Sequence, residues 1–134
     1  MIIPRTKGFD PLLCADPRIL ILGTLPGGES LTHRQYYYSN SNRIWTVLCY
    51  LTGEPIPINY TQKKALLAKY HIVLWDYYES ATRPNSSNDN AIRDGQPNDI
   101  PAFLAEYQTI KTIAVNGFGK YKKFGRKLSK ELAG

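Results

Sequence analysis

Amides, hydroxyls and aromatic rings gather directly after an apolar run near the start of the chain. Residues 19–22 are aliphatic and end in Gly23-Thr24-Leu25-Pro26, and Tyr36-Tyr37-Tyr38, Asn42 and Trp45 follow. An amide offers a donor and an acceptor, and an aromatic ring offers a flat face for stacking. These side chains suit recognition of a flat heterocycle with polar groups on its rim, and no nucleophile paired with a base stands out among them.

Three strands are expected to position these residues. Residues 18–23 form the first strand, whose consecutive aliphatic side chains are typical of a strand buried on both faces of a parallel sheet. Residues 71–76 and 112–115 form the others, and each ends in a polar segment: residues 77–97 and Asn116-Gly117. Because right-handed crossovers bring the carboxyl ends of parallel strands to one edge, the site is expected there.

Helices are expected between the strands. Residues 24–41 are predicted as a long loop, of the length that is usually functional, and Asn42 as the N-cap of a helix over residues 43–52. Further helices are predicted over residues 61–70, from Asn98 or Asp99 to Tyr107, and, rich in lysine, from Phe118 onward. Residues 1–17 are rich in proline and should be extended. The fold class is α/β: a three-layer α/β/α sandwich with a short, mainly parallel central sheet.

Length and composition limit the class of protein. With 134 residues and 43% hydrophobic content, the chain is expected to form one domain, residues 1–134. A net charge of +6 favours an acidic partner such as nucleic acid, although a basic surface kept for solubility explains it nearly as well. Cys14 and Cys49 support neither a metal site nor a disulfide framework. Without a membrane span or a signal peptide, a cytoplasmic monomer is expected.

The order of these motifs resembles a known family. Gly23-Thr24-Leu25-Pro26, then Gln35-Tyr36-Tyr37, then Asn42-x-x-Trp45 resembles the uracil-DNA glycosylase superfamily, in its hypoxanthine-DNA (deoxyinosine) glycosylase branch. The later motifs also match: Leu74-Trp75-Asp76, Ser80-Ala81-Thr82-Arg83, Ser87-x-Asp89-x-x-Ile92 and Asn116-Gly117. The resemblance runs from Ile19 to about Tyr121.

The resemblance implies an enzyme that flips a deaminated base, hypoxanthine or uracil, out of DNA and hydrolyses its N-glycosidic bond. It needs no metal, cluster or organic cofactor, and two cysteines exclude the four-cysteine iron–sulfur version. By the same resemblance Asn42 and Thr24 are catalytic, Asn42 by orienting water or assisting the leaving base. The resemblance assigns substrate binding to Gly23, Leu25, Pro26, Tyr37, Ile44, Asp89 and Asn116.

The chain departs from the family pattern at three places. Ser39 and Asn40 stand where the family commonly has His-Pro, and Ile44 stands where an aromatic residue usually stacks on the base. The family also continues past the basic helix into another strand and a Ser/Pro-rich loop, whereas this chain stops at Gly134. The alternative function is therefore a non-catalytic DNA-binding or structural relative of the fold. A small nucleotide-binding module is a third option, although the Gly-Lys-Ser/Thr of a P-loop is absent.

Each site residue also has a purely structural interpretation. Asn42 is explained as a helix cap without catalysis, and the three tyrosines are explained as packing in a loop. Asp76 and Asp89 fit a strand-end cap and a loop cap better than catalytic acids. The joint arrangement, more than any one residue, favours a site.

Overall fold

The computed structural model describes residues 5–39, 42–83 and 92–116. Its centre is a parallel sheet of β2 (Ile19–Gly23), β3 (Ile72–Asp76) and β6 (Thr112–Val115), in the order β3-β2-β6. In the middle strand, Ile21 is paired with Leu74 of β3 and with Ala114 of β6. The predicted strands and their parallel pairing are confirmed.

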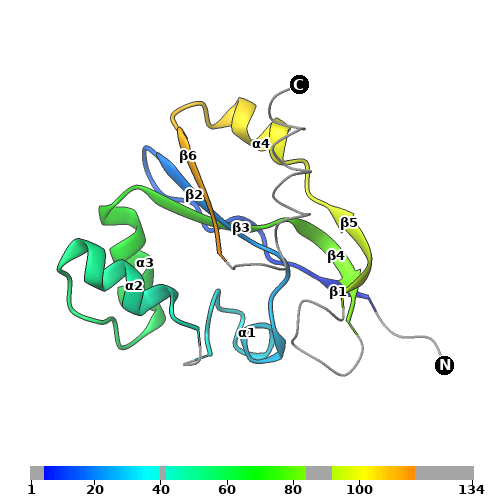
Figure 1. The fold of residues 1–134 in the computed structure, drawn as a ribbon, viewed down its shortest axis with the longest axis horizontal. Helices are drawn as coiled ribbons and strands as arrows, with labels where there is room; N and C mark the ends of the chain where they lie inside the picture. Colours follow the sequence, from blue (N-terminus) through cyan, green and yellow to red (C-terminus); the bar gives the residue numbers. More distant parts are fainter. Residues whose placement is uncertain (1–4, 40–41, 84–91, 117–134) are drawn as a thin grey trace.

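Helices cover both faces of this sheet (Figure 1), which confirms the three-layer α/β/α architecture. On one face, α2 (Ile44–Thr52) and α3 (Tyr60–Lys69) bring Leu48 and Leu67 into one apolar cluster with Ile21 and Leu74. On the other, α4 (Ile100–Glu106) closes a second cluster, made of Leu20, Leu22, Val73, Ile100 and Phe103 with their neighbours. Side chains of β2 therefore alternate between two buried layers, as their unbroken aliphatic sequence predicts.

A second sheet lies where the sequence predicted a loop. β1 (Thr6–Lys7), β4 (Tyr78–Thr82) and β5 (Arg93–Pro97) pair antiparallel in the order β1-β4-β5. The prediction of a loop was wrong for residues 78–82 and 93–97, whereas residues 84–91 lie outside the described residues. β5 was missed because its sequence, Arg-Asp-Gly-Gln-Pro, lacks β-branched and aromatic residues. Pairing with β4 stabilises β5 instead. Gly95 allows the Tyr78 ring to pack, since a Cβ there would lie 2.2 Å from Tyr78 Cε1.

A short helix interrupts the predicted loop of residues 24–41. α1 (Gly28–His33) has no side-chain cap at Gly27 and ends at Arg34, whose φ of 53° is left-handed. Six residues are too few to show helical periodicity in a sequence, and for that reason the prediction of an unstructured loop was wrong here.

The other helices start close to their predicted residues. α3 starts at Tyr60, one residue before the predicted start, and Asn59 caps it by accepting a hydrogen bond from Gln62 N at 2.8 Å. Asp99 caps α4, as predicted, by accepting from Ala102 N at 3.0 Å. Arg43 is the residue before α2, so Asn42 lies one position farther out than an N-cap. The predicted basic helix after Phe118 lies outside the described residues.

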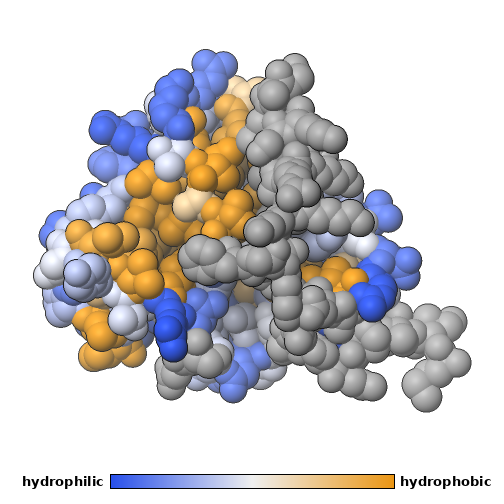
Figure 2. Space-filling view, viewed as in Figure 1, coloured by the Kyte–Doolittle hydropathy of each residue, from blue (hydrophilic) through white to orange (hydrophobic). Residues whose placement is uncertain are grey.

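α2 is apolar on both faces. Its outer side and the segment that follows expose large hydrophobic side chains, namely Val47, Tyr50, Leu51, Ile56 and Ile58. Hydrophobic residues accordingly reach the surface in Figure 2 on the side where Figure 1 shows α2. Within the described ranges, no helix combines the length and the apolar character that crossing a membrane requires.

Candidate active site

The carboxyl ends of the parallel strands meet at one edge of the sheet. Gly23 ends β2 and is paired with Asp76, which ends β3. Asn116 follows β6, and its backbone N–H donates to Leu22 O at 3.0 Å. In Figure 1, β2 and β6 point toward the side of the molecule that holds α1 and the segment before α2. The predicted convergence of Gly23 and Asn116 at this edge is confirmed.

Gly23 is packed so closely that only glycine fits. A Cβ at this position would lie 2.6 Å from Asp76 Oδ1 and 2.8 Å from Tyr37 Oη. Such distances are shorter than van der Waals contact, so a side chain would force Asp76 or Tyr37 to move. Gly23 therefore lets the backbone of β2, a carboxylate and a phenol come together.

Asp76, for which the sequence favours a strand-end cap, lies in the site. Its side chain is 3% exposed, and its backbone carbonyl accepts a hydrogen bond from Asn98 Nδ2 at 2.8 Å. The end of a buried strand was the available signal, but an aspartate there also fits a cap. Its register opposite Gly23 brings it into the site.

The segment at the end of β2 is held by residues that follow β3. Tyr77 N donates to Gly23 O at 2.8 Å, and Tyr78 N donates to Thr24 O at 3.1 Å. The guanidinium of Arg83, which follows β4 and is 9% exposed, donates to Pro26 O. Thr24, Leu25 and Pro26 are buried, so this segment contributes a fixed backbone wall more than accessible side chains.

The aromatic residues of the long loop have different roles. Tyr37 has a left-handed φ of 53°, and its carbonyl accepts a hydrogen bond from Trp45 Nε1 at 2.9 Å, which ties the loop to α2. Tyr36 is buried; its hydroxyl donates to Asp10 O at 2.8 Å, and burial raises the pKa of Tyr36 far above its ordinary value. Tyr38 stacks on His33, with ring centroids 3.8 Å apart. Tyr36 and Trp45 thus belong to the core, and Tyr37 is the aromatic that reaches the strand ends.

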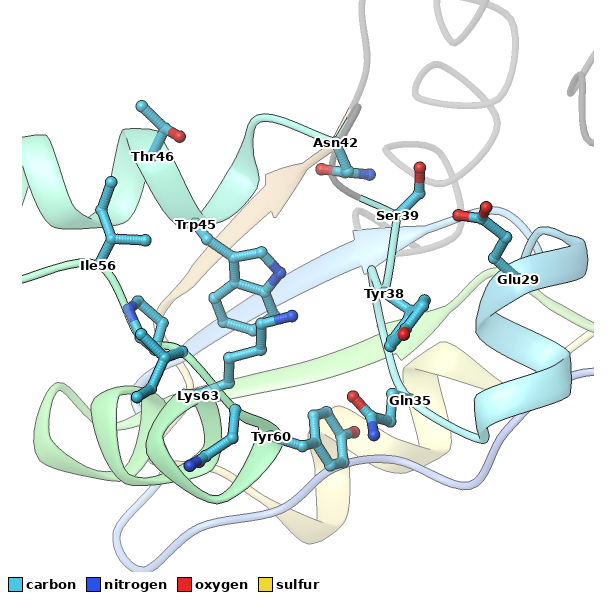
Figure 3. A pocket seen from close by; sticks show the side chains of 13 residues that line it. Glu29, Gln35, Tyr38, Ser39, Asn42, Trp45, Thr46, Ile56, Tyr60 and Lys63 are labelled. Atoms are coloured by element: carbon cyan, nitrogen blue, oxygen red, sulfur yellow. The ribbon is translucent and has the colours of Figure 1, made fainter.

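Asn42 has a fixed orientation at the start of α2. Its Oδ1 accepts a hydrogen bond from Ile44 N at 3.0 Å, and its backbone N–H donates to Ser39 O at 3.0 Å. The side chain therefore caps the helix, although from outside the N-cap position. The same side chain lines a pocket of about 660 Å³ (Figure 3), where its amide nitrogen is directed toward Ser39.

The other predicted substrate-binding residues are placed differently. Ile44 packs in the apolar cluster with Trp45 and Leu48, so its side chain faces the core. An aromatic side chain at position 44 in the same orientation would also point into the core, so it would reach a ligand only if the packing changed. Asp89 lies outside the described residues.

No group of metal-ligating side chains is found in the part of the chain that the structure describes. His, Cys, Asp and Glu residues do not gather in threes there. Cys14 is partly buried and Cys49 is buried, both as free thiols, and burial raises the pKa of each. Thiols with raised pKa values are poor nucleophiles at neutral pH.

Comparison with known proteins gives consistent relatives, although no protein-family model matches the chain. It is 31% identical over 130 residues to a hypoxanthine DNA glycosylase from Methanosarcina barkeri, covering 95% of this chain and 82% of the relative. A hypoxanthine DNA glycosylase from Methanosarcina acetivorans is also 31% identical, over 93% of this chain and 80% of its own length.

A solved structure gives the same assignment. A solution NMR structure from M. acetivorans, provisionally named a uracil DNA glycosylase, superposes with a TM-score of 0.77 at 30% identity. The match covers 94% of this chain and 80% of that one. Fold and sequence thus give one assignment: the chain belongs to the hypoxanthine DNA glycosylase branch of the uracil-DNA glycosylase superfamily.

Proposed function

We propose that this protein is a DNA glycosylase that hydrolyses the N-glycosidic bond of a deaminated base, hypoxanthine or uracil, in base-excision repair. The observation that carries the proposal is the cluster of Gly23, Asp76 and Tyr37 at the strand ends, in a chain of this family. The carboxyl ends of the strands are where an open α/β sheet binds its ligand. Flipping is least costly for a mispaired base, which favours deamination products as substrates.

Asn42 acts by position. An amide cannot serve as a general base at neutral pH, so it holds the attacking water or donates a hydrogen bond to the departing base. The oxygen of water bonds to the sugar carbon, the base leaves with the electron pair of the glycosidic bond, and the proton that the water loses is balanced by the proton that the departed base takes up. The hydrogen bond from Ile44 N to Oδ1 supports this role because it fixes the side chain before substrate binds.

The wall made by Gly23, Thr24 and Pro26 lies beside the sugar and the water, and Asn116 reads the edge of the base. Hydrogen bonds from Tyr77, Tyr78 and Arg83 hold the carbonyl groups of Gly23, Thr24 and Pro26 in place. A fixed wall of backbone dipoles needs no rearrangement as charge develops on the sugar. A net charge of +6 offsets the phosphates of the DNA.

Base release from labelled duplexes tests the proposal. Each duplex carries a single uracil, hypoxanthine or xanthine, and strand cleavage at the resulting abasic site is measured for the wild type and for Asn42→Ala. We expect release of hypoxanthine or uracil by the wild type and at least a 100-fold loss in Asn42→Ala, the scale of losing one preorganised polar group.

Asp99→Ala is the matched control. Like Asn42→Ala, it removes a side chain that accepts a hydrogen bond at the start of a helix, but Asp99 caps α4, on the other face of the sheet. If both variants lost activity in proportion to their stability, Asn42 would be only a cap. Duplex binding by a wild type that releases no base from any duplex would favour the non-catalytic DNA-binding relative.

A further inference from the structure

The pocket beside Asn42 is larger than the space that one amide requires. It has a volume of about 660 Å³ and lies between the start of α2, the start of α3 and the segment that follows α1 (Figure 3). Its polar walls are made by Glu29, Gln35, Ser39, Asn42, Asn59 and Lys63. A ligand in this pocket would therefore lie next to the residue that we place at the reaction.

Lys63 is the cation of this pocket. Its Nζ lies 5.1 Å from the centre of the Trp45 ring and 6.0 Å from that of Tyr38, and Figure 3 shows its side chain passing along Trp45. Among the residues that the structure describes, Lys63 has no carboxylate within ion-pair distance. The aromatic faces stabilise the ammonium group only in part.

The position of Lys63 is electrostatically unfavourable without a ligand. The side chain is half-buried, and desolvation lowers the pKa of Lys63. It also lies in the first turns of α3, where the helix dipole disfavours a positive charge. An anion bound near Nζ would relieve both costs, which gives a physical reason for a lysine here.

The surrounding groups suit a tetrahedral anion better than a flat ring. Gln35, Ser39 and Asn59 carry amide or hydroxyl donors on the pocket wall. Trp45 is 6% exposed and Lys63 covers part of its face, so it cannot stack on a base. Glu29 lies on the α1 side of the pocket and would oppose an anion placed close to it, which leaves the Lys63 side as the binding position.

We infer that this pocket binds a backbone phosphate of the DNA strand, within a few nucleotides of the base that is processed at Asn42, with Lys63 as its counter-charge. The inference rests on the proposed function for the presence of DNA at Asn42. It adds a second contact that sets the register of the strand, because phosphate contacts position a protein without reading sequence.

The salt dependence of binding tests this inference. Affinity for an undamaged duplex is measured over a range of salt concentrations for the wild type, Lys63→Gln and Lys64→Gln. Lys64 is the matched control because it is adjacent, exposed, and has its Nζ 5.4 Å from the Tyr60 ring centre. The slope of log K against log salt is negative, and we expect it to become less steep by about 0.9 in Lys63→Gln and to stay unchanged in Lys64→Gln.

Rescue and stability complete the comparison. Lys63→Arg should keep the wild-type slope, and thermal unfolding should show that Lys63→Gln is folded. An unchanged slope in Lys63→Gln, or an equal fall in both glutamine variants, would overturn the inference.

Removing the charge of single phosphates locates the contact. Duplexes with one methylphosphonate at successive positions around the target should include a position where wild-type affinity falls and Lys63→Gln affinity does not. Loss of affinity for a free mononucleotide in Lys63→Gln, with duplex binding unchanged, would instead assign the pocket to a small molecule and contradict the inference.

These readouts are independent of base release. A Lys63 effect on binding in a chain that releases no base would refute the glycosylase function alone. Base release without any Lys63 effect on the salt slope would refute the phosphate contact alone.

Discussion

Gly23 and Asp76 end neighbouring parallel strands in the same register, and a Cβ on Gly23 would lie 2.6 Å from Asp76 Oδ1. Through this pairing, the register of the sheet determines which groups meet at the candidate site. The strands bring the two backbones to one edge, and the missing side chain leaves the space that the carboxylate and the Tyr37 phenol occupy.

Gly23→Ala should damage both stability and activity. Its Cβ would overlap Asp76 and Tyr37, and over-packing of this kind costs about 1–3 kcal/mol in the free energy of unfolding. Base release should fall more than stability explains, because the displaced groups lie at the site. Urea unfolding and single-turnover base release measure the two effects.

Gly53→Ala provides the control for that substitution. Gly53 ends α2 with φ of 76°, and a Cβ there would meet nothing within 4 Å. Backbone strain should reduce stability by about 1 kcal/mol, while base release by the folded protein stays at the wild-type rate. A wild-type rate of base release in Gly23→Ala would contradict the prediction and show that catalysis does not depend on the close packing at Gly23.

Tyr36 should make stability depend on pH in alkali. Burial raises the pKa of Tyr36 above its ordinary value of 10.0, so the folded chain keeps a proton that the unfolded chain loses above pH 10. The contribution is fully present below pH 10. Above it, the free energy of unfolding should fall by about 1.4 kcal/mol per pH unit from this group.

Tyr36→Phe tests this assignment. The variant should lose this part of the alkaline slope, and at neutral pH it should be about 1 kcal/mol less stable because the hydrogen bond to Asp10 O is lost. Tyr50→Phe is the control, since Tyr50 is 87% exposed. Urea unfolding between pH 8 and 11, the range of the phenol titration, gives the comparison. Equal slopes in the wild type and Tyr36→Phe would contradict the prediction.

The strands of the parallel sheet could be predicted because each is marked by a short apolar run in the sequence. Residues 19–22 are consecutive aliphatics in a short run that ends in Gly23 and Pro26, which is typical of a strand covered on both faces. β5 could not be predicted, because its polar sequence becomes a strand only through its pairing with β4. α1 is too short for its pattern to be distinguished from a loop.

The site was predictable to the extent that strand ends define it. Gly23 and Asn116 could be placed because Gly23 ends an apolar strand and Asn116 directly follows one. The position of Ile44 could not, since the first turn of a helix does not reveal which side faces the core. Asp76 required the register with Gly23, and the Lys63 pocket required the packing of α3 against Trp45 and Tyr38.

Asn59→Ala should weaken the start of α3. Asn59 accepts the hydrogen bond from Gln62 N, and loss of such a cap costs about 1 kcal/mol. Since α3 carries Lys63, the variant should also weaken duplex binding. Urea unfolding and duplex titration, with Asp99→Ala as a cap variant of similar cost, test this. If Asn59→Ala weakens binding through Lys63, it should weaken binding much less when it is combined with Lys63→Gln.

Arg83 should control the rate of base release through the loop it holds. Its guanidinium donates to Pro26 O and is 9% exposed, so Arg83→Met keeps much of the packing but leaves that carbonyl without its donor. A shift of the loop by about 1 Å can cost about 100-fold in rate. We expect single-turnover base release to fall well beyond the loss of stability, with duplex affinity nearly unchanged.

Arg5→Met is the matched control for Arg83→Met. Arg5 also donates from its guanidinium, to Ser80 Oγ at 3.0 Å and Asp94 O at 2.7 Å, but it does so at the exposed edge of the β1-β4-β5 sheet. The two substitutions remove the same charge from a basic protein, so they should change the salt dependence of binding similarly. Only Arg83 reaches the wall beside Gly23, and equal losses of rate in both variants would show that charge, not the position of the loop, sets the effect.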